Sequence, residues 1–295
     1  MPKTIELSPT LLSRLDALRL SVRHVRWGTR MGGRFAISRR GSSIEFADYA
    51  AYAPGDDIRS IDWKLYARLD RLFVKTYKEE IELAVEIVVD ATASMGLPSP
   101  QKFERAVQLG LCLAHIGLAG RHHVRMSYLK PGRTLASAWC FHRADLARLT
   151  AWGSATQPGG RMAFSEWVRT ALPVLRMRGG QLLLISDGMC QAADWFQALH
   201  LLMRRHLEIK CIQVITPEEL NPARLTRGGV LVDSETGLTH ELGYSASELS
   251  RAVSQHNETL ARFCKRQGIL FVQHRLDEPL DEFLLKTLPA RGFLE

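Results

Sequence analysis

The sequence predicts an α/β domain with a doubly wound, mainly parallel sheet, helices on both faces, and an N-terminal helix and β-turn extension. From residue 81 onward, short and largely apolar runs such as residues 83–89, 182–186 and 209–215 alternate with longer amphipathic segments. Strands that are apolar on both sides are typical of parallel sheets covered on both faces. Before residue 81 the pattern is one helix followed by turns and β-like pieces. We therefore expect residues 1–80 to form an extension packed on a main domain of residues 81–295.

In the extension, Ser8 and Pro9 are a good helix start, as N-cap and first helical residue. Apolar residues then recur at helical spacing as far as Val25, and Gly28 ends the predicted helix. A turn is expected at residues 52–57, and strand segments are expected from Trp63 onward, on both sides of a second turn near Asp70.

In the main domain, short apolar runs predict the strands and the amphipathic segments between them predict the helices. A turn at residues 130–133 predicts a hairpin, and a second hairpin is expected at the sheet edge around residues 234–237. The predicted strands are 81–90, 124–129, 134–141, 181–186, 209–215, 230–233, 238–242 and 270–274, and the predicted helices are 102–119, 144–149, 164–175, 192–205, 247–265 and 281–288.

Composition excludes several classes of protein. No apolar run is long enough to span a bilayer, and the first residues lack the apolar stretch of a secretory signal. The five cysteines are scattered and form no C-x-x-C pair, which argues against a disulfide framework and against a zinc site. We expect a cytoplasmic protein that is not integral to a membrane.

The net charge of +8 is concentrated near the N-terminus. Eight arginines and a single acid, Asp16, lie between residues 14 and 40. The predicted helix carries Arg19, Arg23 and Arg26 as a stripe beside its apolar face, which would suit an acidic partner or an anionic surface. The alternative is an ordinary solvated face with internal ion pairs. Nucleic-acid binding is not expected, since no aromatic residues alternate with these arginines.

The strand predicted at residues 81–90 ends in Asp90, and hydroxyls follow at Thr92 and Ser94. These oxygens suit a small hard cation such as Mg²⁺. Asp187 ends another predicted strand and could hold a metal-bound water. The four residues are therefore a candidate metal site. The alternative is that Asp90 caps its own loop and the hydroxyls bond to backbone amides.

The loop between these strands speaks against a working metal site. The spacing D-x-T-x-S from Asp90 to Ser94 resembles the D-x-S-x-S of metal-ion-dependent adhesion sites. Such adhesion-type sites take a further hydroxyl from this loop, usually a threonine just after a glycine pair. Here the pair Gly159 and Gly160 is followed by Arg161, and Thr156 lies at the wrong spacing. We expect Arg161 to point toward the two aspartates and to repel a divalent ion. An alternative function is a metal-dependent hydrolase with Asp90 as nucleophile, but Thr92 stands where a second acid would be needed.

A second motif, Y-x-P-G-D-D-x-R-x-I-D-W, runs from Tyr52 to Trp63. It reads as a braced β-turn module, and it also offers a surface for docking a partner. The candidate partner-binding residues here, beside the three arginines above, are Asp56, Asp57, Arg59, Asp62 and Trp63.

Residues 41–75, the Asp90–Ser94 motif and the closing residues 277–285 resemble bacterial domain-of-unknown-function family fifty-eight. The resemblance implies a von Willebrand factor A-like fold and pairing with a MoxR-type AAA+ ATPase. It also implies a non-enzymatic adaptor that helps to assemble or activate other complexes. The Asp90 motif would then be a degenerate metal-ion-dependent adhesion-type site.

Overall fold

The computed structural model divides the chain into two compact units, residues Met1–Gly33 with Leu83–Glu295, and residues Arg34–Glu82. It describes residues 5–22, 45–52, 58, 61–78, 83–132, 135–175, 180–221, 231–232, 239–240 and 246–295. The N-terminal helix thus belongs to the larger unit, whereas we expected it to share an extension with residues up to 80. The reason is that Leu15 is fully buried in the core of the larger unit.

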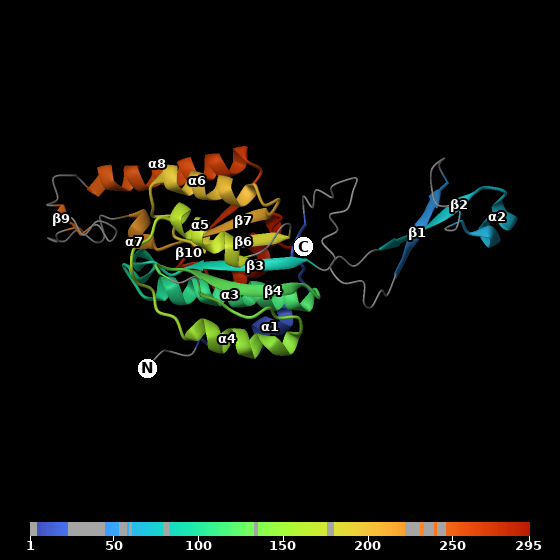
Figure 1. The fold of residues 1–295 in the computed structure, drawn as a ribbon, viewed down its shortest axis with the longest axis horizontal. Helices are drawn as coiled ribbons and strands as arrows, with labels where there is room; N and C mark the ends of the chain where they lie inside the picture. Colours follow the sequence, from blue (N-terminus) through green and yellow to red (C-terminus); the bar gives the residue numbers. More distant parts are fainter. Residues whose placement is uncertain are drawn as a thin grey trace. The chain divides into compact units, whose positions relative to one another are not determined.

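The larger unit is built on a six-stranded sheet in the order β10-β7-β6-β3-β4-β5 (Figure 1). All neighbouring strands are parallel except β4 and β5. The strands are β3 (Ala84–Asp90), β4 (His123–Leu129), β5 (Leu135–Ala136), β6 (Gln181–Ser186), β7 (Glu208–Ile215) and β10 (Leu270–Arg275). The mainly parallel α/β sheet is confirmed, as is the hairpin partner of β4.

Helices cover both faces of this sheet (Figure 1). One face carries α3 (Gln101–Ala119), with α1 (Pro9–Leu15) and α4 (Leu146–Ser154) packed on it, over a core that includes Ile87 and Val89. The other carries α5 (Phe164–Leu175), α6 (Ala192–Met203) and α8 (Ala246–Arg266), over a core around Val88 and Trp167. Because successive side chains of β3 point to opposite faces of the sheet, β3 contributes to two separate cores, one on each face.

The shorter elements complete the larger unit. Residues Leu280–Ala290 form one helical run, composed of α9 (Leu280–Glu282), η5 (Phe283–Thr287) and α10 (Leu288–Ala290). The predicted second hairpin forms a sheet of its own, β8 (Leu231–Val232) with β9 (Thr239–His240), and not an edge of the main sheet. The remaining short helices are η2 (Ala93–Gly96), η3 (Arg143–Asp145) and α7 (Pro217–Leu220).

The first helix is much shorter than predicted. Ser8 and Pro9 do begin it, but α1 ends at Leu15, and Leu20 instead forms a β-bridge with Leu294 near the C-terminus. The apolar spacing beyond residue 15 reflects pairing and burial of an extended segment, which periodicity alone does not distinguish from a helix. The predicted helix end near Gly28 lies outside the described residues.

The smaller unit contains an antiparallel pair, β1 (Glu45–Ala51) and β2 (Phe73–Lys78), and one helix, α2 (Trp63–Leu69). We predicted strand at Trp63, and that was wrong. Asp62 is the N-cap of α2, and its carboxylate accepts hydrogen bonds from the amides of Lys64 and Leu65 at 3.0 and 3.1 Å. A capped start stabilises a helix by about 1 kcal/mol and outweighs the β preference of Trp. The turn predicted near Asp70 is present, because Asp70 is left-handed with φ 50°.

Candidate functional site

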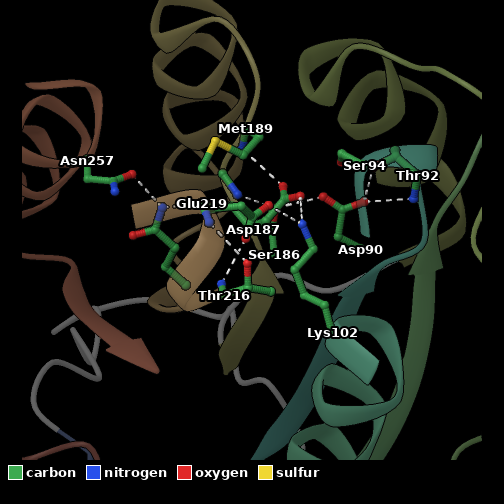
Figure 2. Close-up of polar contacts among 12 residues, drawn as sticks. Asp90, Thr92, Ser94, Lys102, Ser186, Asp187, Met189, Thr216, Glu219 and Asn257 are labelled. Carbon is green, nitrogen blue, oxygen red and sulfur yellow. Dashed lines mark hydrogen bonds and ion pairs between the residues drawn. The ribbon is translucent and has the colours of Figure 1, made fainter. Parts of the chain in front are cut away.

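The order of strands places Asp90 and Asp187 at neighbouring strand ends. The chain runs from β3 to β4 on one side of β3 and then crosses to β6 on its other side. Ligands of α/β sheets bind where the strand order reverses in this way, at the carboxyl ends of the strands. Asp90 is the last residue of β3, and Asp187 directly follows β6. The expected proximity of the two carboxylates therefore follows from the parallel register of these strands (Figure 2).

Three donors from two residues, Thr92 and Ser186, hold the Asp90 carboxylate. Its Oδ1 accepts from the amide and the hydroxyl of Thr92 at 2.9 and 2.7 Å, and its Oδ2 accepts from the Ser186 hydroxyl at 2.7 Å. The hydroxyls of Thr92 and Ser94 are 3.1 Å apart. The predicted oxygen cluster of Asp90, Thr92 and Ser94 is thus formed, with Asp90 also capping its own loop. Only 6% of Asp90 is exposed.

Asp187 is held by a lysine that the sequence reading did not single out. The Lys102 ammonium, on the first turn of α3, donates to Asp187 Oδ2 at 2.9 Å and to Glu219 Oε1 at 2.6 Å. Asp187 Oδ1 accepts from the Met189 amide at 3.0 Å. Figure 2 shows the Lys102 side chain extending from α3 toward these two acids. Lys102 is fully buried, so its charge depends on them.

Glu219 joins this cluster through a capped turn after β7. Thr216 and Glu219 form a capping box at α7, in which the Thr216 amide donates to Glu219 Oε2 at 2.8 Å. The other oxygen of Glu219 faces Lys102. Lys102, on α3, therefore connects the residue after β6 with the helix after β7, and this contact holds α7 at the site.

The electrostatics of the cluster follow from burial. Burial and the neighbouring Asp187 raise the pKa of Asp90 to about 6, against the hydrogen bonds from Ser186 and Thr92. Burial also raises the pKa of Glu219, although Lys102 opposes the shift. Burial lowers the pKa of Lys102, but Asp187 and Glu219 outweigh it and the pKa lies above its ordinary value. Lys102 is therefore an ammonium at neutral pH.

A divalent cation does not fit between these two aspartates. The oxygens of Asp90, Thr92 and Ser94 have the chemistry that Mg²⁺ prefers, but an ammonium already contacts Asp187. At an effective dielectric constant of about 20, a divalent ion and an ammonium about 4 Å apart repel by roughly 8 kcal/mol. Within the described residues, no three His, Cys, Asp or Glu side chains are placed to hold a metal ion.

Arg161 occupies the expected loop but not the expected contact. The glycine pair lies against the end of β3, where the Gly159 amide donates to Ala91 O and the Ala93 amide donates to Gly160 O, both at 2.9 Å. Arg161 then lines a cavity of about 580 Å³ together with Thr92, Ser94 and Glu166. In the described part of the chain it forms no hydrogen bond or ion pair with Asp90 or Asp187. Arg161 therefore lies in the same cavity as Thr92 and Ser94, as expected for its loop, and the contact with Asp187 is made by Lys102.

The partner-binding candidates fall into three groups. Arg23, Arg26, Asp56, Asp57 and Arg59 lie outside the described residues. Asp62 is buried, caps α2 and accepts from the Tyr49 hydroxyl at 3.0 Å, so it helps to hold the smaller unit together. Arg19 and Trp63 are exposed, and the Arg19 guanidinium donates to the carbonyls of Asp16 and Leu18.

Three residues of the site were missed in the sequence: Lys102, Ser186 and Glu219. For Lys102 the signal was its place beside Phe103 at the start of a largely apolar helix. A lysine in such a helix is almost never fully buried unless it is paired, so an acidic partner could have been expected. Ser186 directly precedes Asp187 and was read only as the end of a strand. Glu219 follows Thr216 by three residues, which is the spacing of a capping box.

Comparison with known proteins gives relatives without an assigned activity. Uncharacterized protein Rv1480 of Mycobacterium tuberculosis is 26% identical over 282 residues, covering 91% of this chain and 86% of that protein. Uncharacterized protein Mb1516 of Mycobacterium bovis matches to the same extent. No described helix is both long and apolar enough to cross a membrane.

Solved structures give only a weak likeness. The conserved hypothetical protein BatB from Bacteroides thetaiotaomicron matches with a TM-score of 0.41 and 14% identity, over 71% of this chain and 98% of that chain. The pilus adhesin SpaC from Lactobacillus rhamnosus GG matches with a TM-score of 0.43 and 8% identity, over 74% and 31%. These scores carry no functional argument. A family model, in contrast, matches residues 48–262, well over half of the chain. The chain belongs to the family described as protein of unknown function DUF58.

Proposed function

We propose that this chain is a non-enzymatic adaptor in the cytoplasm that works with a MoxR-type AAA+ ATPase in assembling or activating other complexes. The family resemblance motivates the partner and the von Willebrand A-like reading of the fold. The strand-end cluster of Asp90, Thr92, Ser94 and Asp187 would then be a degenerate adhesion-type site, which binds a partner and catalyses no reaction.

The observation that supports the proposal best is that the carboxylates of Asp90 and Asp187 are both held by other groups of the protein. A nucleophilic carboxylate needs an open approach to the substrate and a proton donor for the leaving group. Asp90 is buried and has hydrogen bonds on both of its oxygens, and the Lys102 ammonium is taken by Asp187 and Glu219. This arrangement favours a rigid binding surface over the alternative hydrolase.

A surface for the ATPase is available on α2. Trp63, Tyr66 and Leu69 recur every third residue, and 59%, 40% and 54% of their areas are exposed. The rings of Trp63 and Tyr66 pack edge to face at 6.2 Å. Exposed aromatic residues at such spacing are typical anchors of protein interfaces. Lys64 and Arg68, both exposed on the same helix, favour a partner surface with acidic residues.

The test is capture of the MoxR-type ATPase of the same organism, purified separately, by the immobilised full-length chain. We expect saturable capture by the wild type and a loss of about tenfold or more in affinity when Trp63, Tyr66 and Leu69 are all changed to serine. A matched control changes three exposed apolar residues elsewhere, Leu97, Leu135 and Phe141, to serine and should bind as the wild type does.

Two results would overturn the proposal. One is failure of the wild type to capture the ATPase, with and without nucleotide. The other is trapping of a phosphate mimic such as beryllofluoride at Asp90, lost in Asp90→Asn, which would establish the hydrolase.

A further inference from the structure

Lys102 occupies the place in this cluster where a cation would be expected. Its ammonium is fully buried and lies 2.9 Å from Asp187 and 2.6 Å from Glu219. Asp187 directly follows β6 and Glu219 lies on α7 after β7, 85 and 117 residues away from Lys102 in the chain. The bonds from a lysine amine to two carboxylates on separate elements resemble the way a bound ion joins protein ligands.

The charges at the site require a cation. Asp90, Asp187 and Glu219 lie at one end of the sheet, and the Asp187 charge acts on both of the other acids. Buried carboxylates that approach each other need a positive charge or a proton. Two hydroxyls and one backbone amide hold Asp90, whereas the Lys102 ammonium contacts both Asp187 and Glu219.

We propose that Lys102 is the built-in cation of the strand-end site and takes the role that a divalent metal ion would have between Asp187 and the neighbouring acids. The site is therefore independent of divalent cations. This inference rests on the proposed function only where it concerns partner binding. If the adaptor binds its partner through this site, it should do so equally well in the presence of a chelator.

The same contacts would also exist if Lys102 were only a structural ion-pair member. The two roles differ in what happens when the ammonium is removed. Lys102→Met keeps most of the side-chain volume and leaves Asp187 and Glu219 uncompensated beside Asp90. If Lys102 stands in for an ion, Asp187 and Glu219, the two acids that its ammonium contacts, bind a divalent ion in its place. If it only braces α7, the variant loses stability and gains no affinity for metal.

The experiment titrates the full-length chain with Mn²⁺, followed by electron paramagnetic resonance for binding and by thermal unfolding for stability. We expect no saturable binding in the wild type and no change in its Tm. Lys102→Met should have a lowered Tm in chelator, a Tm that Mn²⁺ restores, and affinity for Mn²⁺ about tenfold or more above that of the wild type. Adding Asp187→Asn to Lys102→Met should abolish that binding, because Asp187 is one of the two acids that the Lys102 ammonium contacts.

Two control variants separate the explanations. Lys286→Met removes a lysine that is exposed and paired with Glu282, and it should behave as the wild type does. Arg161→Thr tests the arginine that lines the adjacent cavity, and it should also leave the chain without Mn²⁺ binding.

Tight Mn²⁺ binding by the wild type that Asp90→Asn removes would overturn the inference, and this result needs no folded Lys102 variant. A folded Lys102→Met that Mn²⁺ neither binds nor stabilises would overturn it as well. Failure of the adaptor proposal appears separately, as lost capture of the ATPase by the wild type. The role of Lys102 is decided by the metal titration alone.

Discussion

At the scale of single residues, Glu86 shows how burial changes an acid. It lies on β3 opposite Arg125 of β4, is fully buried, and accepts from Arg125 Nε at 2.7 Å and from the Ser127 hydroxyl. Burial raises the pKa of Glu86 to about 7, although Arg125 and the hydrogen bonds oppose the shift. Arg125 in turn stacks over the ring of Trp139, 4.6 Å from its centre. An ionised Glu86 therefore costs folding free energy.

This predicts a pH dependence of stability. The unfolded chain releases the Glu86 proton near pH 4.5, whereas the folded chain keeps it until about pH 7. The folded state binds more protons in that window, so Glu86 should lower the free energy of unfolding as pH rises, by up to roughly 3 kcal/mol. Glu86→Gln should remove this part of the slope in urea unfolding at several pH values between 4.5 and 7.5. Parallel curves for the two proteins would contradict the assignment.

At the scale of elements, residues 19–21, which follow α1, and residues 293–295 are held together beside β7. Leu20 and Leu294 form an antiparallel bridge, and the amides of Arg19 and Glu295 donate to each other's carbonyls at 2.8 and 2.9 Å. The fully buried Lys210 donates to the Ser21 carbonyl, to the Ser21 hydroxyl at 2.9 Å and to the Phe293 carbonyl at 3.1 Å. One ammonium thus donates to polar groups of both segments.

Removing that ammonium should loosen both segments. Lys210→Met removes one of the donors to the Ser21 carbonyl and to the Phe293 carbonyl, and the donor to the Ser21 hydroxyl. Gln181 Nε2 still donates to the Ser21 carbonyl at 2.6 Å and the Ser21 amide to the Phe293 carbonyl at 3.3 Å, so we expect a loss of roughly 1–3 kcal/mol of unfolding free energy. Urea unfolding followed by tryptophan fluorescence measures it. Lys286→Met, at an exposed position, should stay within about 0.5 kcal/mol of the wild type. An equal change in unfolding free energy in the two variants would show that Lys210 does not hold these two segments together.

At the scale of the whole molecule, the charge is +8 and the N-terminal arginines supply most of it. Arg19 is exposed just after α1, and its guanidinium bonds only to nearby carbonyls among the contacts described above. A concentrated positive charge of this kind should affect association more than folding.

Changing Arg19, Arg23 and Arg26 to glutamine should therefore leave the Tm nearly unaltered and weaken salt-sensitive binding to the ATPase or to anionic vesicles. The physical reason is screening over a Debye length of about 8 Å at physiological ionic strength. Binding measured at low and high salt tests this. The control changes Arg262, Lys265 and Arg266 of α8, which are exposed, to glutamine and alters the net charge equally. Ready unfolding of the first variant, or equal loss of binding in the control, would contradict the prediction.

The sequence by itself determined the parallel sheet, most of its strands and the meeting of Asp90 with Asp187. Apolar runs that end in an acid are local signals, and the carboxyl ends of parallel strands necessarily lie at one edge. The capped helix at Trp63 was mispredicted, because one hydrogen-bonding aspartate outweighed the β preference of the residues after it. The length of α1 was also mispredicted, because the partner of Leu20 lies at the other end of the chain.

Only the tertiary structure decided which cation serves the site. Arg161 was the obvious candidate, being next to the glycine pair, and it lies in the right loop. The contact belongs instead to Lys102, whose partners Asp187 and Glu219 are brought to it by the crossing of the chain from one side of β3 to the other. Sequence pattern records the polarity and spacing of residues along a chain. A buried charge is stabilised by whatever the fold brings within hydrogen-bond distance, and that depends on all the packed elements at once.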